Sequence, residues 1–236
     1  MSLHLTTPAT RRTFLKHLAV AAGGVVLLPI VTSCTSEPGK SAGKTAAKTG
    51  KPGAKDDPTA VPEVKPENWD AIAYNKARGN AGKIPETYHA SINGPDGVKK
   101  HLGKHLPYVP ALEPKLVPEG YLAVMWGDPK LGYTKHPNAP KSDSNAEGHW
   151  YNWIEVRKAL AGEAIAEKSE YPTWPATGDL KAAGYLVEGQ AGDLAADNGT
   201  HTIYLAKLPS DVKKGDTVRI WAHCLTHGEY VDFLTV

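Results

Sequence analysis

Short apolar runs separated by turn residues dominate the second half of the chain. These runs are rich in aromatic and β-branched residues and cover residues 121–126, 149–156, 202–206, 217–221 and 230–236. Proline and glycine residues separate the later runs. Short strands of this kind, divided by turn signals, are typical of an antiparallel β-sandwich or barrel. The pattern therefore predicts an all-β fold for this part of the chain.

The residues before these runs show weaker patterns. Apolar residues at helical spacing predict a short helix within 68–82, and turn residues at 93–97 predict a loop. The alanine-rich stretch 180–199 is compatible with either a short helix or a loop. We therefore expect a loop-rich extension on the N-terminal side of the β domain.

Residues 1–33 have the features of an export signal rather than of a folded domain. The segment 10–16, which contains Arg11 and Arg12, resembles the twin-arginine export motif. The apolar run that follows, 18–33, is shorter than the ~20 residues that usually span a bilayer. It ends in V-T-S-C, which resembles a lipoprotein cleavage box, so we expect cleavage before Cys34 and a lipid on Cys34. An uncleaved signal anchor with an incidental cysteine is the alternative.

The twin-arginine motif and the lipoprotein cleavage box predict a protein on the periplasmic side of the bacterial cell envelope. We expect the protein to contact the membrane only through its lipid anchor. Residues 34–66 are rich in Gly, Pro, Ala, Ser, Thr and Lys, a composition typical of a flexible linker. The remaining segment, 67–236, is then the folded β domain. The net charge of +2 offers no electrostatic case for binding nucleic acid.

The chain has two cysteines, and only one of them is left for chemistry in the folded domain. If Cys34 carries lipid, Cys224 is an unpaired thiol in an oxidising compartment, where metal ligation would protect it. Cys224 and His227 form a C-x-x-H pair at the end of an apolar run. Thiolate and imidazole together favour iron, copper or zinc over calcium or magnesium. A single cysteine excludes a zinc finger and a C-x-x-C-H haem attachment site.

Four histidines lie in sequence contexts that carry further information. The contexts are, in chain order, K-H-L-P at 104–107, H-P-N at 136–138, H-W-Y-N-W-I-E at 149–155 and C-L-T-H-G at 224–228. In this order they resemble the iron-binding segments of superoxide reductases, the neelaredoxin and desulfoferrodoxin family. That family shows K-H-x-P, H-P, H-aromatic-x-x-W-I-E and a terminal C-N-x-H-G. The resemblance covers about residues 100–236.

The resemblance implies one mononuclear non-haem iron per chain. Its ligands would be His105, His136, His149 and His227 in a plane, with Cys224 as the axial ligand and the sixth position open. The implied reaction is the reduction of superoxide to hydrogen peroxide, with electrons from an external donor that the sequence does not name. The implied fold is an immunoglobulin-like β-sandwich. A homo-oligomer is compatible with the sequence.

This ligand set also makes chemical sense by itself. A site that reacts with an oxidant needs a vacant coordination position, and a thiolate trans to it donates electron density to the metal. By resemblance, Lys104 lies beside the open position and attracts the superoxide anion. If Cys224 faces the metal, strand alternation turns His223 away from it. His89, His101 and His201 have no counterpart in the family segments, and we expect them at the surface.

The sequence departs from the family pattern in three places. Gly103 stands where the family commonly has a glutamate before the lysine. The spacing from His136 to His149 is longer than usual, and Leu225 stands where the family has asparagine. The four-cysteine iron domain of desulfoferrodoxins is absent from this sequence.

Two other classes of protein compete with this interpretation. A cupredoxin-like electron-transfer protein also combines a β-sandwich with a terminal Cys-x-x-His, but it usually adds a methionine soon after the histidine. This chain has only Met1 and Met125. A degenerate domain that retains the fold without a metal is the third option. Metal analysis of the native protein separates the three.

Overall fold

The computed structural model describes residue 57 and residues 59–174, 179–189 and 193–236. The predicted signal peptide 1–33, the predicted lipidation site Cys34 and most of the predicted linker lie outside the described residues. Among the described helices, none has the length and hydrophobicity needed to cross a membrane.

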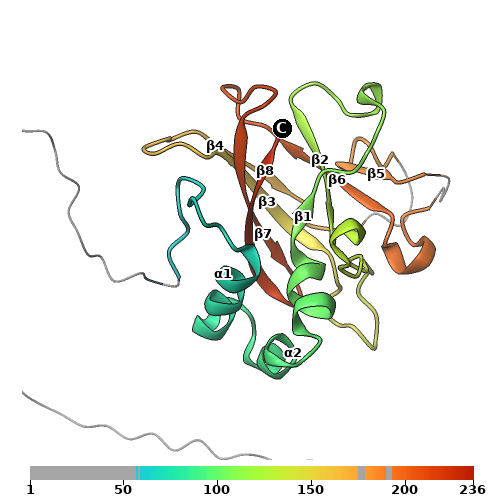
Figure 1. Ribbon diagram of the computed structural model, residues 1–236. Helices are drawn as coiled ribbons and strands as arrows, with labels where there is room; N and C mark the ends of the chain where they lie inside the picture. Colours follow the sequence, from blue (N-terminus) through green and yellow to red (C-terminus); the bar gives the residue numbers. More distant parts are fainter. Residues whose placement is uncertain (1–56, 58, 175–178, 190–192) are drawn as a thin grey trace, which may run out of the picture. The chain divides into compact units, whose positions relative to one another are not determined.

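Two four-stranded antiparallel sheets form the described domain (Figure 1). One sheet has the order β1-β2-β6-β5, and the other has the order β4-β3-β7-β8. The strands are β1 (Pro107–Tyr108), β2 (Tyr121–Trp126), β3 (Tyr151–Lys158), β4 (Ala166–Glu170), β5 (Tyr185–Val187), β6 (Thr202–Lys207), β7 (Thr217–Cys224) and β8 (Gly228–Thr235). The predicted all-β, immunoglobulin-like sandwich is thus confirmed at the level of the fold.

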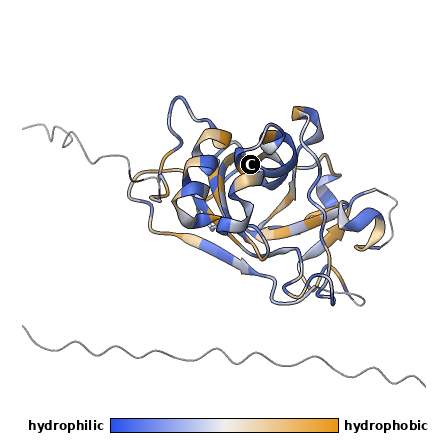
Figure 2. Cartoon of the chain, turned by 90° about the horizontal axis from the view of Figure 1, so that it is seen from below, coloured by the Kyte–Doolittle hydropathy of each residue, from blue (hydrophilic) through white to orange (hydrophobic). Residues whose placement is uncertain are grey.

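The main hydrophobic core lies between the two sheets. On β7, the inward side chains Val218, Ile220, Ala222 and Cys224 are fully buried, whereas the residues between them face outward. Aromatic residues from both sheets complete this core, and in Figure 2 the strands carry much of the hydrophobic colour. Burial of alternate residues is the expected result of a strand with one face against a core.

All five apolar runs predicted as strands are strands in the structure. The sequence pattern missed β1, β4 and β5. β4 is an edge strand of sequence AEKSE, whose residues are exposed or half-buried, so it has no apolar alternation to detect. The ambiguous stretch 180–199 contains both β5 and a helical turn.

The N-terminal extension consists of short helices joined by loops. The helix α1 (Ala71–Arg78) lies within the predicted range 68–82, and α2 (His89–Asn93) follows it. The short helical turns of the domain are η1 (Gly79–Lys83), η2 (Glu86–Tyr88), η3 (Val98–Leu102), η4 (Gly103–His105), η5 (Pro114–Leu116), η6 (Pro129–Leu131) and η7 (Ala196–Gly199). Both α-helices lie near one end of the sandwich, away from the C-terminus (Figure 1).

Helix α1 covers the exposed edge of β8. The amide of Asn75 donates to the carbonyl oxygen of Val231 (2.7 Å), and the N–H of Val231 donates to Asn75 Oδ1 (2.8 Å). This pairing satisfies backbone groups that an edge strand otherwise leaves open. The helix is further tied to β8 by Arg78, whose guanidinium lies 3.2 Å from the carboxylate of Glu229.

The last residues of the predicted linker also contact the domain. Tyr74 donates to the carbonyl oxygen of Ala60 (2.5 Å), and Glu63 accepts a hydrogen bond from the N–H of Gly162 (2.9 Å). Arg219 donates to the carbonyl oxygen of Pro62 (3.4 Å). These residues are therefore part of the folded unit in the structure.

Candidate metal centre

The structure brings all five residues predicted as metal ligands into one group. His105, His136, His149, Cys224 and His227 each offer one donor atom, and these atoms all lie within 4.8 Å of one another. Four of the residues are buried and His149 is half-buried. Residues that span more than half of the β domain thus meet at one point.

Sheet register explains why the group forms at one end of the sandwich. Cys224 ends β7 and pairs with Tyr151 at the start of β3, so His149, two residues before β3, lies near the end of β7 that carries the sulfur. The N–H of His136 donates to the carbonyl oxygen of Trp126, the last residue of β2 (3.0 Å). His149 is held by paired backbone hydrogen bonds to Ala139. An irregularity in the β3 register directly after Tyr151 accompanies this arrangement, as is common beside functional sites.

His105 presents an unpaired nitrogen to the group. Its ring stacks on Tyr230 with centroids 4.3 Å apart, and its Nδ1 donates to the carbonyl oxygen of His101 (2.6 Å). Its Nε2 therefore carries the lone pair, and this buried atom has no hydrogen-bond partner among the described residues. An unsatisfied buried polar atom costs about 1–3 kcal/mol, a cost that a metal–nitrogen bond removes.

The distances between donor atoms fit a single ion. His149 Nε2 and His227 Nδ1 are 2.9 Å apart, and Cys224 Sγ lies 3.6 Å from both His136 Nε2 and His227 Nδ1. Neighbouring ligands at bond lengths of ~2.1–2.3 Å around one ion are about 3 Å apart. His149 Nε2 and His227 Nδ1 already have this spacing, the sulfur is slightly more distant, and all five donor atoms lie within 4.8 Å of one another, so the group fits one metal ion.

The turn after β7 is built around the cysteine sulfur. The backbone N–H groups of Thr226 and His227 point toward Cys224, and such donors stabilise a thiolate. The next residue, Gly228, has φ +84°, and a Cβ there would lie 2.1 Å from the carbonyl oxygen of Lys83. Only glycine fits this position, which sets the approach of the turn to the helical extension.

Burial sets the protonation states of the five residues. Desolvation lowers the pKa of His149 to about 4 and that of His227 to about 2. Desolvation, with the neighbouring histidines, also holds the pKa values of His105 and His136 well below their ordinary value. Burial raises the pKa of the Cys224 thiol to about 12. At neutral pH the metal-free group therefore has neutral imidazoles, ready to bind, and one protonated thiol.

These states predict that metal binding releases one proton. The histidines are already neutral above about pH 5, so only the Cys224 thiol must ionise to become a ligand. The apparent affinity for a divalent metal should then rise about tenfold per pH unit between about pH 6 and 9. Calorimetric titration with zinc in buffers of different ionisation enthalpy measures the released protons. Release of two or more protons, or of none, would contradict these protonation states.

Lys104 lies next to the group in the chain and acts on it electrostatically. Its charge contributes to the lowered pKa values of His136, His149 and His227. Lys104 itself is half-buried, and desolvation lowers its pKa, whereas Cys224 acts in the opposite direction. The ammonium is thus near enough to influence a charged ligand at the centre.

Tyr133 explains why position 103 is a glycine. A Cβ on Gly103 would lie 2.3 Å from Cδ1 and 2.4 Å from Cγ of Tyr133, so the base of the ring fills this space. A larger side chain at this position requires the Tyr133 side chain to change its rotamer or the backbone to shift.

His101, which the sequence analysis placed at the surface, is buried. Its Nε2 lies 3.1 Å from the hydroxyl of Tyr230, and its Nδ1 lies 3.3 Å from Ser91 Oγ. Tyr230 in turn donates to the carbonyl oxygen of His227 (3.0 Å). His101 is therefore linked to the candidate ligand His227 through the hydroxyl of Tyr230. His101 and His105 are four residues apart, a spacing that places two side chains on the same face of a helix. This spacing was a signal in the sequence that His101 lies close to His105. His89 and His201 are half-buried and lie outside the group.

Comparison with known proteins adds one weak similarity. No protein-family model matches the chain, and no curated protein matches it. Among solved structures, a variant of superoxide reductase (neelaredoxin) from Archaeoglobus fulgidus in its reduced form is similar, with 18% sequence identity and a TM-score of 0.28. The match covers 57% of this chain and 89% of the other. A similarity of this size carries no conclusion about function, so the chemistry of the centre rests on its own donor atoms.

Proposed function

We propose that the β domain is a superoxide reductase that uses one mononuclear non-haem iron at the four-histidine, one-cysteine centre. The convergence of five donor atoms within 4.8 Å supports this proposal more than any other observation. Structural zinc sites take four protein ligands, whereas five protein donors leave one position free around a six-coordinate iron.

The donor set argues against the cupredoxin alternative. A blue-copper centre uses two histidines and one cysteine, with a methionine as a distant axial ligand. Here four histidines share the group, and Met125 packs in a separate core cluster with its sulfur 3.5 Å from the hydroxyl of Tyr108. Met1 lies outside the described residues.

The residues around the centre suit reduction of a small anion. A bound iron would supply the single electron that superoxide needs to become hydrogen peroxide, and two protons from solvent complete the reaction. His149 and Lys104 are half-buried, whereas the other four residues of the group are buried, which supports an approach of small molecules beside His149 and Lys104. Lys104 would attract the anion and order the water that delivers the protons. An external electron donor, which this structure does not identify, must restore the reduced state.

The test is the stoichiometry of a single turnover, in which protein loaded with iron and reduced beforehand to the ferrous state reacts with superoxide. Reduction gives one hydrogen peroxide for each superoxide consumed and releases no dioxygen, whereas dismutation gives one peroxide and one dioxygen for two superoxides. We expect one iron per chain and a one-to-one yield. Copper in the native protein, no metal at all, or a yield of one half would overturn the proposal.

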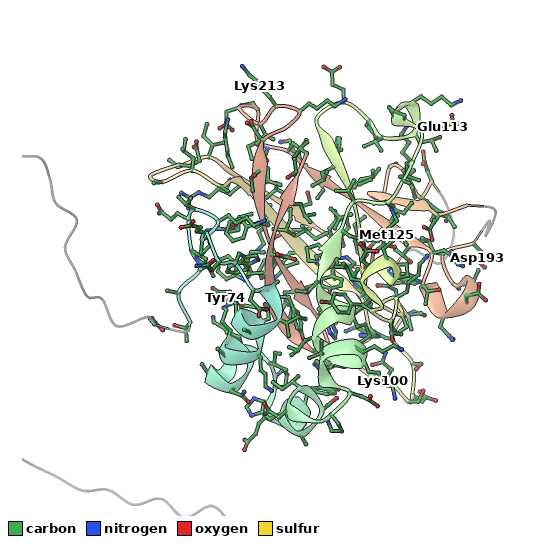
Figure 3. The ribbon with its side chains drawn as sticks, in the orientation of Figure 1. Tyr74, Lys100, Glu113, Met125, Asp193 and Lys213 are labelled. Atoms are coloured by element: carbon green, nitrogen blue, oxygen red, sulfur yellow. The ribbon has the colours of Figure 1, made fainter. Side chains whose placement is uncertain are left out.

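Lys104→Ala should slow the reaction with superoxide by about tenfold at low salt, because an ammonium beside the centre raises the local concentration of the anion. The difference from the wild type should shrink as ionic strength rises. Lys213→Ala is the matched control, since Lys213 lies at the opposite end of the domain from Lys100 (Figure 3). Pulse-radiolysis rate constants at several salt concentrations measure the effect. A rate that responds to neither Lys104 nor salt would remove Lys104 from the mechanism.

Cys34→Ala should move the protein from the membrane fraction to the soluble periplasmic fraction, because we propose that this residue carries the lipid. Replacing Arg11 and Arg12 by lysine should block export. Fractionation of cells with antibody detection measures both. Unchanged membrane association of Cys34→Ala would favour an uncleaved anchor instead.

A further inference from the structure

We infer that Asn138, held by the loop 197–199, is a positioning residue that selects the metal-binding tautomer of His136. The inference rests on the proposed metal centre. It comes from a buried hydrogen-bond network in which every polar atom of one amide side chain has an assigned partner.

The two ends of the Asn138 amide are distinguished by their partners. Its Nδ2 lies 2.8 Å from the carbonyl oxygen of Gly199 and 3.2 Å from that of His136. Because two carbonyl oxygens can only accept, the nitrogen must face them, and the opposite orientation of the amide would place oxygen against oxygen. The remaining atom, Oδ1, is therefore an acceptor only.

This orientation decides the proton position on His136. Oδ1 of Asn138 lies 3.3 Å from His136 Nδ1, so Nδ1 must carry the hydrogen and donate it. The lone pair is then on Nε2, the nitrogen that lies 3.6 Å from the sulfur of Cys224. The opposite tautomer would place a hydrogen where the metal should be and a lone pair against Oδ1.

Tyr204 completes the network by donating a second hydrogen bond to the acceptor atom of Asn138. Its hydroxyl donates to Asn138 Oδ1 (2.7 Å) and accepts from the N–H of Tyr151 (3.1 Å). Asn138, Tyr204 and Tyr151 are all buried, so no water competes for these contacts.

The loop 197–199 holds Asn138 from the other side. Asp197, Asn198 and Gly199 follow one another in the left-handed region, with φ values of 48°, 57° and 70°. This conformation directs the carbonyl oxygen of Asn198 to the N–H of Asn138 (2.8 Å) and that of Gly199 to its side chain. Non-glycine residues retain such a backbone only where the surroundings enforce it, often beside functional sites.

Gly199 is essential to this contact. A Cβ at this position would lie 2.2 Å from the carbonyl oxygen of Asn138. The backbone carbonyl groups of Asn198 and Gly199, which are far from His136 in sequence, therefore act on one ligand of the centre through Asn138.

The first experiment compares three substitutions in the metal-free protein and in the protein titrated with cobalt(II). Asn138→Ala removes the acceptor, so nitrogen-15 NMR should show His136 in mixed tautomers, and cobalt affinity should fall by about 10–100-fold. Asn138→Asp retains an acceptor for His136 Nδ1 but places its second oxygen against the two carbonyl oxygens, so it should keep the Nδ1–H tautomer while binding cobalt more weakly than the wild type. Tyr204→Phe removes a buried hydroxyl from the same amide, yet it should leave the tautomer unchanged.

The second experiment tests the loop with a matched pair of glycines. Gly199→Ala should displace Asn138 and lower cobalt affinity by about tenfold or more. Gly162→Ala is the control, because Gly162 has the same φ of 70° but no atom within 4 Å of its added Cβ. The two glycines share the same φ of 70° and differ in the contact with Asn138.

The outcomes separate this inference from the proposed function. If His136 loses the Nδ1–H tautomer in Asn138→Asp, or if His136 keeps one tautomer in Asn138→Ala, the positioning role is refuted. If Gly162→Ala weakens cobalt binding as much as Gly199→Ala does, the role of the loop is refuted. A protein that shows the expected tautomers and affinities but does not reduce superoxide leaves the inference intact and overturns only the proposed function.

Discussion

Cys224→Ser should abolish tight metal binding and superoxide reduction while the sandwich still folds. Serine matches the shape of cysteine, but its hydroxyl ionises far less readily than a thiol, so it supplies no anionic ligand at neutral pH. The change removes one of the five donor atoms of the centre. Loss of a ligand should lower the metal affinity by more than the ~10–100-fold that is typical when a residue hydrogen-bonded to a ligand is replaced.

Colour and metal content give the clearest measurement of this change. An oxidised iron centre with a thiolate ligand should absorb visible light through charge transfer from sulfur, and Cys224→Ser should lose that band. His223→Ala is the matched control, because His223 is the neighbouring residue on the opposite face of β7, with its Nδ1 2.6 Å from Asn152 Oδ1. Colour and activity that persist in Cys224→Ser would show that the sulfur is not the ligand.

Glu229→Gln should destabilise the domain by about 3 kcal/mol, because it leaves the buried charge of Arg78 without its carboxylate partner. The Arg78 side chain has 0% exposure and the Glu229 side chain 22%. Two guanidinium nitrogens of Arg78, Nε and Nη1, have no hydrogen-bond partner among the described residues, so the contact of Nη2 with Glu229 matters all the more. The expected loss of stability is at the lower end of the range for breaking a buried ion pair because the Glu229 carboxylate is partly hydrated.

Thermal unfolding measures this effect, with an expected fall in Tm of about 6–12 °C for a domain of this size. Glu113→Gln is the control, since Glu113 pairs with Lys115 at the surface, with side chains 69% and 78% exposed, and should change stability by less than about 1 kcal/mol. Replacing Arg78 by methionine together with Glu229→Gln should recover part of the loss, because no unpaired charge then remains. Equal effects of Glu229→Gln and Glu113→Gln would contradict the role of the buried pair.

Local chemistry accounts for what could be predicted from the sequence. The five strands predicted from the sequence have one or both faces in a hydrophobic core. A strand with one buried face needs apolar residues at every second position, and a strand with two buried faces needs them along its whole length. The five residues that meet at the centre could be named because each lies in a short segment with its own signature. The edge strand β4 could not be found in this way, since its exposed residues face no such demand.

The sequence by itself determined the strand pattern and the set of candidate donors, because both depend on residues close together in the chain. Tertiary structure alone decided how those donors are held. The contact of Asn138 with Gly199 joins residues 61 positions apart, and the contact of His101 with Tyr230 joins residues 129 positions apart. Whether Tyr133 fills the space beside Gly103 likewise depends on where a distant loop packs. Such hydrogen bonds and contacts follow from the register of the sheets and the path of the loops, and no local pattern of hydrophobic and polar residues encodes them.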